Sequence, residues 1–145
     1  MRKIAIGSDH GGFAYKEASK AYLESLGYAV IDCGTYSEES CHYPVYGEAV
    51  AREVAKGEAE FGVVICTSGE GIAMAANKVP GVRCGLAYND EVAKLMRQHN
   101  NANVIAFGQK FMAIEDVLRR INIFLNTEFE GGRHQTRVEM IDKIK

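Results

Sequence analysis

Three short segments hold residue types that can move protons or bind an anion. The first is Ser8-Asp9-His10-Gly11-Gly12, the second runs from Cys66 to Gly71, and the third runs from Glu130 to Arg137. Together they offer carboxylates, imidazoles, a thiol, hydroxyls and guanidiniums, with glycines that let a ligand approach the backbone closely. This set suits the handling of a small phosphorylated molecule, although each segment also has a simpler structural explanation.

The first and third segments offer contacts for a phosphorylated sugar. Asp9 beside His10 can hydrogen-bond sugar hydroxyls or a phosphate, or Asp9 simply accepts backbone N–H groups as the N-cap of the next helix. Arg133, His134 and Arg137 are spaced so that a helix brings all three near one face. At a helix start they form a clamp for a phosphate group, or they are a solvated basic face.

The second segment, Cys66-Thr67-Ser68-Gly69-Glu70-Gly71, lies between a strand-like run and a helix-like stretch. Such a turn points several backbone N–H groups at one place, where an anion such as an enediolate is stabilised. The Walker pattern is absent and the dinucleotide fingerprint is incomplete. The thiol would gain reactivity as a base beside the positive end of that helix. Alternatively, Cys66 is a small apolar residue that fills the end of a buried strand.

His99 and Asn100 come at the end of a predicted helix, just before the fifth predicted strand. A histidine there can simply favour the helix C-terminus electrostatically. If His99 is catalytic, its position creates a geometric problem, because the start of the fifth strand lies at the opposite edge of the sheet from Cys66. A site that uses both residues therefore implies an oligomer with shared active sites.

Short runs rich in isoleucine and valine alternate with stretches whose apolar residues recur at helical spacing. The runs predict strands over residues 3–7, 29–33, 61–66, 82–87 and 103–107. Helices are expected between them, over residues 14–26, 45–54, 73–78, from 89 onward and 114–125, with a last short helix over about 135–144. Gly27 follows the first helix as a stop signal, and Asn89 fits an N-cap.

This alternation predicts an α/β fold with helices on both faces of a parallel sheet. We expect a flavodoxin-like, Rossmann-type three-layer αβα sandwich with a five-stranded parallel sheet. The sequence shows no internal repeat, low-complexity segment or linker, so a single domain over residues 1–145 is expected. In such sheets, ligands bind outside the carboxyl ends of the strands, where the Asp9 and Cys66 segments begin.

The composition argues against several classes of function. With a net charge of −2, general binding to nucleic acid or to an anionic membrane is not expected. No apolar run approaches the ~20 residues that span a bilayer, and the apolar run at the start is too short for a signal-peptide core. The four cysteines include no CxxC pair, so we expect no zinc knuckle. The lack of a signal-peptide pattern leads us to expect free thiols in a reducing cytoplasm.

Taken in order, the segments resemble the family of ribose-5-phosphate isomerase B and the related subunits of galactose-6-phosphate isomerase. The matching motifs are spread along nearly the whole chain. They are Ser8-Asp9-His10, Gly12-Phe13, Ile31-Asp32, Gly34-Thr35, Tyr43-Pro44, Cys66 to Lys78, Arg97-Gln98-His99-Asn100, Asn103-Val104, Ala106-Phe107-Gly108 and Glu130 to Arg137. The resemblance implies a cofactor-free, metal-free enediol mechanism in homodimers or homotetramers, with each active site at a dimer interface.

The resemblance also implies catalytic roles. Cys66 would move a proton between carbons 1 and 2 of the sugar, and Thr67 or Ser68 would relay a proton between its oxygens. His99 of the partner subunit would open the sugar ring, and Asp9 would bind hydroxyls and assist ring opening. The other expected substrate contacts are His10, Tyr43, Gly69, Glu70, Gly71, Asn100, Lys110, Arg133, His134 and Arg137.

Three positions depart from the family pattern. His42 precedes Tyr43 where many members have aspartate, and Glu70 adds a negative charge to the anion-binding loop. Lys110 stands where an arginine often binds phosphate, and lysine keeps the charge but loses the planar fork. These departures bear on the identity of the sugar more than on the reaction type.

We therefore expect an aldose–ketose isomerase that interconverts ribose 5-phosphate and ribulose 5-phosphate. One alternative is isomerisation of a six-carbon sugar phosphate, such as allose 6-phosphate or galactose 6-phosphate. Another is a non-catalytic sugar-phosphate sensor, but a thiol base and a ring-opening histidine favour catalysis. A redox protein is disfavoured, because no recognisable flavin or nicotinamide motif follows the glycine-rich loop.

Overall fold

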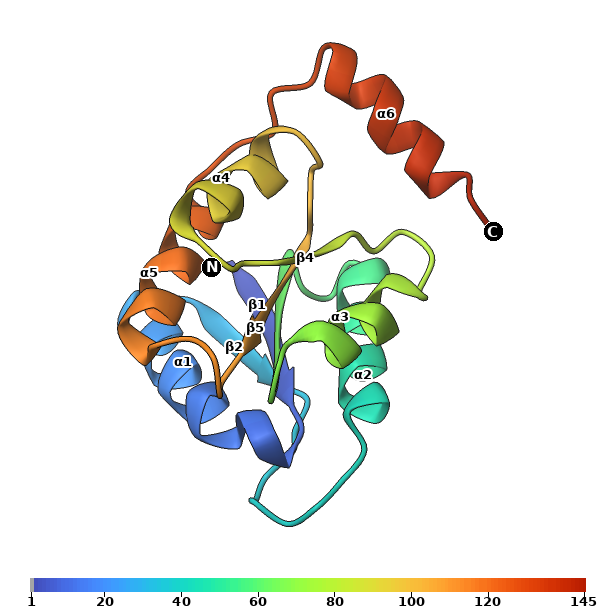
Figure 1. Ribbon diagram of the computed structural model, residues 1–145. Coiled ribbons are helices and arrows are strands. Elements are labelled where there is room, and N and C mark those ends of the chain that lie inside the picture. Colours follow the sequence, from blue (N-terminus) through green and yellow to red (C-terminus); the bar gives the residue numbers. More distant parts are fainter. Residues whose placement is uncertain (1) are drawn as a thin grey trace.

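The computed structural model describes residues 2–145 and shows a five-stranded parallel sheet with helices on both faces (Figure 1). The expected αβα fold class is therefore confirmed. The strands are β1 (Lys3–Ser8), β2 (Ala29–Asp32), β3 (Phe61–Cys66), β4 (Cys84–Leu86) and β5 (Val104–Gly108). The helices are the 3-10 turn η1 (His10–Gly12), α1 (Phe13–Ser25), α2 (Tyr43–Ala55), α3 (Glu70–Asn77), α4 (Asp90–Gln98), α5 (Ile114–Leu125) and α6 (Arg133–Asp142).

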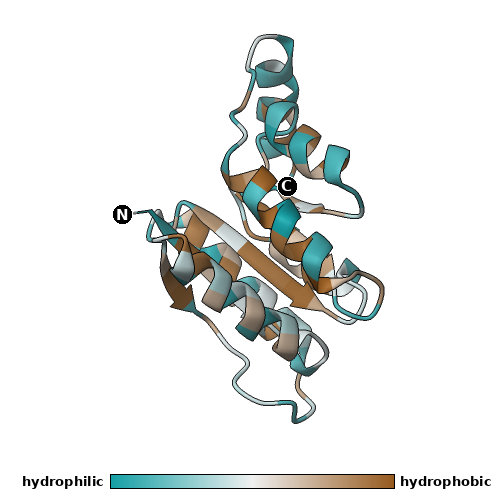
Figure 2. Ribbon diagram, turned by 90° about the vertical axis from the view of Figure 1, so that its left-hand side faces the viewer, coloured by the Kyte–Doolittle hydropathy of each residue, from teal (hydrophilic) through white to brown (hydrophobic). Residues whose placement is uncertain are grey.

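The period-two alternation of the strands sorts the core into two layers. Ile6 and Ile65 face the side that α1, α4 and α5 cover, whereas Ala5 and Val64 face α2 and α3. Figure 1 shows these helices on the left and right of the sheet, and Figure 2 shows largely hydrophobic strands between them. Among residues 2–145, no helix combines the length and apolar character needed to cross a membrane.

The strand order is β2-β1-β3-β5-β4, so the last two strands are exchanged relative to the expected flavodoxin-like order. β5 is buried throughout, whereas the three residues of β4 are only half-buried. The inner positions of a parallel sheet are covered on both faces and suit continuous apolar runs. The longer, fully buried strand takes the inner position and the three-residue strand takes the edge. As a result, β5 ends directly beside β3.

The predicted elements are all present, with shifted ends. The helix expected from residue 73 begins already at Glu70, because Gly69 adopts a φ of 84° and turns the chain immediately after β3. The last helix starts at Arg133 instead of residue 135, directly after Gly132, whose φ is 59°. Asn89 is the N-cap of α4, as expected, and its side chain accepts the N–H of Val92.

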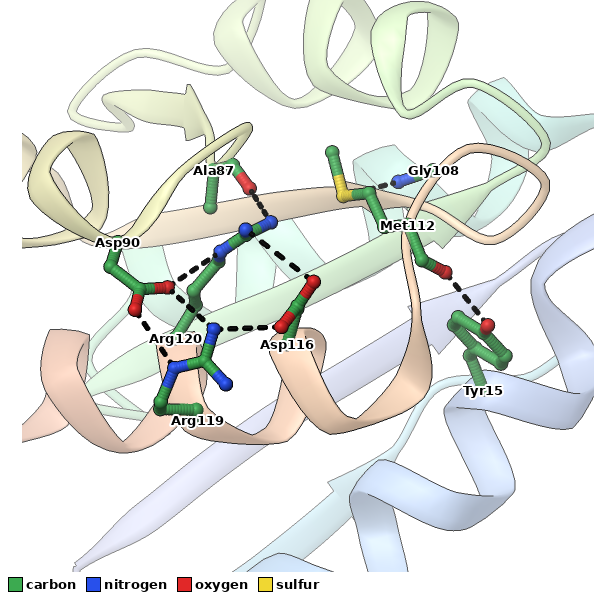
Figure 3. A network of polar contacts seen from close by, with 8 residues as sticks. All are labelled: Tyr15, Ala87, Asp90, Gly108, Met112, Asp116, Arg119 and Arg120. Atoms are coloured by element: carbon green, nitrogen blue, oxygen red, sulfur yellow. Dashed lines mark hydrogen bonds and ion pairs between the residues drawn. The ribbon is translucent and has the colours of Figure 1, made fainter.

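Polar contacts fix the chain between β5 and α5, residues 109–113 (Figure 3). The Tyr15 hydroxyl of α1 donates to the Met112 carbonyl at 2.7 Å. Farther along α5, the buried Arg120 donates to the Asp90 carboxylate at 3.0 Å and so joins α5 to the start of α4. These contacts fix the loop after β5 to α1, and α5 to the start of α4.

Helix α6 stands away from the sandwich, beyond the β4 edge of the sheet (Figure 1). Val138 is buried, whereas Met140 and Ile141 are largely exposed. At the end of the helix, Asp142 pairs with Arg83 next to β4. The helix is therefore tied to the body at its C-terminal end but leaves Met140 and Ile141 largely uncovered.

Candidate active site

The first group of candidate residues lies at the carboxyl ends of β1, β3 and β5. In the sheet register, Ser8 pairs with Ile65 and Cys66 pairs with Gly108, so the loops that follow these strands are neighbours. The N–H of Lys110 donates to the Thr67 carbonyl at 3.1 Å and joins two of the loops. The loops that carry Asp9, Cys66 and Lys110 are therefore neighbours; the sequence predicted this for the first two, whereas Lys110 joins them because β5 lies beside β3.

Asp9 is buried, and its Oδ1 accepts the Gly12 N–H at 3.1 Å. The capping role weighed from the sequence is thus present, and it occupies one of the two carboxylate oxygens. Gly11 lies against Thr67 so closely that a Cβ atom at this position would overlap the threonine hydroxyl. The two loops therefore pack directly on one another, and Oδ2 makes no hydrogen bond within residues 2–145.

Cys66 ends β3 and is 4% exposed. Its sulfur accepts the Gly69 N–H at 3.1 Å, so a backbone dipole points at the atom expected to carry negative charge. Within residues 2–145, the N–H groups of Thr67, Ser68 and Gly71 donate no hydrogen bond to another protein atom. They are free to bind an oxyanion, whereas the N–H of Gly69, an expected substrate contact, is directed at the sulfur.

Two other cysteines are held in the thiol form. Burial, with the charges of Glu53 and Asp32, raises the pKa of Cys33 to about 11. Burial raises the pKa of Cys84 to about 12. Both thiols stay protonated at neutral pH, which suits small apolar residues in or beside buried strands.

Tyr43, Glu70 and Ser68 complete the wall of this group. Tyr43 begins α2, and its ring packs on Gly71, where a Cβ atom would come within 2.5 Å of the ring. The Glu70 N–H donates to Ser68 Oγ at 3.2 Å, and the Glu70 side chain is exposed. The carboxylate of Glu70 thus lies in the solvent-facing first turn of α3, where the helix dipole stabilises it.

His10 is oriented by Cys41, a residue that the sequence analysis left without a role. The Cys41 N–H donates to His10 Nδ1 at 3.2 Å. Nδ1 is therefore an acceptor, so the ring hydrogen of the neutral form is on Nε2, where it can be donated to a phosphate oxygen. No sequence signal marks this contact, because it depends on how the loop between β2 and α2 returns to the end of β1.

The second group lies at the opposite end of the sheet. His99 is the C-cap of α4, and Asn100 follows it on the way into β5. The His99 and His134 rings stack with centroids 4.2 Å apart and an interplanar angle of 12°. Burial, together with the charges of His99 and Arg133, lowers the pKa of His134 below its ordinary value of 6.5. Arg133 and Arg137 are exposed beside it.

Arg97 connects the two chain segments that carry this group. It is buried against the Phe61 ring, 4.8 Å from the ring centroid. Its Nη1 donates to Ala102 at 2.7 Å, on the turn after His99, and its Nε donates to Thr127 at 3.1 Å, on the approach to α6. One side chain therefore connects the two segments that carry the stacked histidines.

Glu130 is the member of this group that sequence reasoning left without a function. Its Oε1 lies 3.8 Å from His99 Nε2 and 3.7 Å from His134 Nε2. The spacing of four residues between Glu130 and His134 was the one feature of the sequence that could have indicated their contact. The proximity of His99 carried no signal, since it arises from the hydrogen bond between the Glu130 N–H and the Gln98 carbonyl at 3.0 Å.

The two groups are separated by the length of β5. This strand runs from Val104, after the His99 turn, to Gly108, beside Cys66. Four steps of about 3.3 Å give a separation of about 13 Å along the strand. One chain therefore assembles Asp9, Cys66 and their neighbours at one end and the histidine group at the other, and it does not bring the two together.

Comparison with known proteins places the chain in a family. Residues 4–141 match the model of the Ribose/Galactose Isomerase family. Ribose-5-phosphate isomerase B of Escherichia coli is 45% identical over 145 residues, which cover 100% of this chain and 97% of that protein. Galactose-6-phosphate isomerase subunit LacB of Clostridium acetobutylicum is 39% identical over 142 residues, covering 97% and 82%.

Solved structures agree with this assignment. Ribose-5-phosphate isomerase B of Clostridium thermocellum superposes with a TM-score of 0.96 at 45% identity, covering 97% of this chain and 95% of that one. The same enzyme of Mycoplasma genitalium, with bound ribulose-5-phosphate, has a TM-score of 0.93 at 37% identity, covering 97% and 94%. The chain belongs to the ribose/galactose isomerase family, and as a member it is an aldose–ketose isomerase.

Proposed function

We propose that this chain interconverts ribose 5-phosphate and ribulose 5-phosphate through an enediolate, in active sites shared between two subunits. The observation that carries the proposal is the separation of two complementary groups by the length of β5. Cys66 and the free N–H groups suit the enolisation, whereas His99 suits ring opening. Relatives named for ribose 5-phosphate, one of them with ribulose-5-phosphate bound, support the choice of a pentose.

At the first group, the Cys66 thiolate removes the proton from carbon 2 of the open-chain aldose. The electron pair moves to the carbonyl at carbon 1, and the resulting enediolate oxygen accepts hydrogen bonds from Thr67, Ser68 and Gly71 N–H. Cys66 returns the proton to carbon 1, while the hydroxyl of Thr67 or Ser68 passes a proton from the oxygen on carbon 2 to the oxygen on carbon 1. The result is the ketose, and no external oxidant or reductant is needed.

The second group supplies the remaining functions from the neighbouring subunit. His99 exchanges a proton with the ring oxygen to open the furanose, and Asn100 binds a hydroxyl. Arg133 and Arg137 clamp the phosphate with two planar guanidiniums. His134 and the Nε2–H of His10 donate further hydrogen bonds to it, with Lys110 as an added positive charge. Asp9 and Tyr43 bind the sugar body.

The exposed side of α6 supports assembly with a second copy. A groove of ≈ 760 Å³ lies between this helix and residues 77–82. Its wall includes Val79, Pro80, Ile141 and Ile144, which suits an apolar partner surface. We include in the proposal a homodimer or homotetramer of one-domain subunits that works in the cytoplasm without nucleic acid or membrane.

A six-carbon sugar phosphate is the second candidate substrate. The 39% identity to a galactose-6-phosphate isomerase subunit favours it, and so do the departures at His42, Glu70 and Lys110. The same enolisation at carbons 1 and 2 serves both sugars. The two sugars would require pockets of different length and different contacts to the phosphate.

The decisive experiment is turnover by chelator-treated protein on ribose 5-phosphate, allose 6-phosphate and galactose 6-phosphate. We expect the highest kcat/KM on the pentose. Conversion of a hexose phosphate alone would transfer the proposal to the six-carbon sugar. Tight binding of all three without turnover would contradict catalysis by this chain alone.

Sharing of sites is tested by mixing two inactive variants, Cys66→Ala and His99→Ala. A mixed dimer holds one site with both lesions and one site with neither, so random exchange should restore about one quarter of the wild-type activity. Exchange is verified by mass spectrometry of differently labelled subunits. Verified exchange without recovery would contradict the shared site.

A further inference from the structure

Three potential metal ligands converge beside the stacked histidines. The ligand atoms of His99, Glu130 and His134 all lie within 4.8 Å of one another. Within residues 2–145, no other trio of histidine, cysteine or acidic side chains meets this condition. The Glu130–Gln98 backbone hydrogen bond and the start of α6 hold the three residues on one local framework.

Two imidazole nitrogens and one carboxylate oxygen are the donor set of three-ligand zinc sites that keep a fourth position open. Magnesium and calcium prefer all-oxygen coordination, so they fit this trio poorly. We propose that His99, Glu130 and His134 form a binding site for a divalent transition-metal ion of the zinc or cobalt type. The fourth position would be filled by water or by another small oxygen ligand.

The present distances require a modest contraction. Bonds of about 2.0–2.2 Å to a tetrahedral ion place neighbouring donor atoms about 3.3–3.5 Å apart, against 3.7 and 3.8 Å from Glu130 Oε1 to the two imidazole nitrogens. The His99 and Glu130 side chains are 39% and 50% exposed and so have room to turn. Because a nitrogen lone pair lies in the ring plane, the His99 ring must rotate out of its stack on His134 for both to reach one ion.

Nearby positive charges repel a cation at this site and so affect which metal ions can bind. Arg133 and Arg137 are near enough to lower the pKa of His134, and both are exposed to screening solvent. The Glu130 carboxylate offsets one of these charges. A weakly bound hard cation would not overcome the repulsion, whereas imidazole-seeking ions gain from direct bonds to two nitrogens.

The test is a Co²⁺ titration of the chelator-treated protein, followed by its visible absorption bands. It is done in a Cys41→Ser/Cys66→Ser background, so that thiolates cannot bind the ion. We expect one Co²⁺ per chain with nitrogen and oxygen ligands. Glu130→Gln and His134→Gln should each weaken binding by about tenfold or more, whereas Glu128→Gln, an exposed carboxylate two residues away, should leave binding unchanged.

Two results would overturn the site. One is the absence of Co²⁺ binding by protein that is folded by circular dichroism. The other is binding that survives Glu130→Gln, or that falls equally in Glu128→Gln. Because these readouts involve no sugar, they stand whether or not the chain isomerises ribose 5-phosphate.

An inhibitory consequence rests on the proposed function. An ion held here would occupy His99 and His134, so Zn²⁺ should inhibit isomerisation. Each variant is compared with its own metal-free rate, and Glu130→Gln should need about tenfold more Zn²⁺ for half-inhibition. Equal sensitivity of wild type and Glu130→Gln would contradict this consequence and point to the Cys66 thiol.

Discussion

Arg83 donates from Nη1 to both carboxylate oxygens of Asp142, at 2.9 and 3.1 Å, and so ties the end of α6 to the edge of the sheet. The Arg83 side chain is 15% exposed and also donates through Nε to the Asn101 carbonyl at 3.0 Å. The same guanidinium thus contacts the turn that follows His99 and the helix that carries Arg133 and Arg137. It sets the position of the proposed phosphate clamp, Arg133 and Arg137, relative to His99, the proposed ring-opening residue.

We therefore predict that Asp142→Asn raises KM for the sugar phosphate about fivefold with little change in kcat. The loss of a partly exposed ion pair is worth about 1 kcal/mol, which is a factor of about five. Glu139→Gln is the matched control, since Glu139 accepts a hydrogen bond from Gln135 within α6. Steady-state kinetics of the two variants decide the matter. A fall in kcat with constant KM would contradict a role in positioning the clamp.

A second prediction concerns Cys66, the proposed base. Cys66→Ala should lower kcat by about 10²–10⁴-fold, the usual contribution of a general base, while KM changes little. Cys33→Ala is the control, because burial raises the pKa of that thiol to about 11 and it stays protonated. Wild-type turnover by Cys66→Ala would remove the sulfur from the mechanism.

A third prediction concerns the fully buried Lys16. Its Nζ lies 2.8 Å from both oxygens of Asp32, at the end of β2. Lys16→Met removes the buried partner of this carboxylate, which keeps only the longer contact with Lys20 and the Gly34 N–H, and should lower the free energy of unfolding by about 3 kcal/mol. Lys20→Met is the matched control: Lys20 Nζ is 3.4 Å from the same carboxylate but its side chain is 35% exposed, so a loss of about 1 kcal/mol or less is expected.

The Lys16–Asp32 pair also makes the free energy of unfolding depend on pH in the acid range. Burial alone would raise the pKa of Asp32, but hydrogen bonds from Lys16 and the Gly34 N–H outweigh it and lower the pKa below 3.8. The stabilisation is therefore complete above pH 3.8 and is lost as pH falls through the lowered value. Urea unfolding in acid should show this loss in wild type and a smaller one in Asp32→Asn. Equal acid sensitivity would contradict the assignment.

A fourth prediction concerns His134 and pH. Because its pKa in the fold lies below 6.5, the unfolded chain binds a proton that the fold excludes. Stability should therefore fall as pH drops from about 7.5 through 6.5 and level off below the lowered value. His134→Gln should flatten this part of the curve, whereas His42→Gln, at an exposed position, should not. Unfolding free energies at several pH values in this range provide the comparison.

Much of the fold was accessible from the sequence because periodicity and capping residues are local. Asn89 and Gly27 marked helix ends that the structure confirms. The order of the last two strands was not accessible, because it depends on which of two apolar runs is buried on both faces. Cys84 to Leu86 are only half-buried in the structure, and the composition of this run does not reveal that.

The site shows the same division between local and long-range information. Cys66 and its loop were recognised because strand, turn and helix are adjacent in the sequence. The stacking of His99 on His134 was not, because it requires the chain to pass through α5 and return to Gln98. The contact of Cys41 with His10 likewise spans a long loop. Contacts that depend on such returns have no periodic signature.

The distance between the two ends of β5 has a genetic consequence. If each active site takes one half from each subunit, a Cys66→Ala allele and a His99→Ala allele should complement one another in the same cell. A single allele that carries both changes should not complement the wild type but interfere with it. Each hybrid dimer it enters would have one defect in each site, so that allele should act as a dominant negative when expressed beside the wild type.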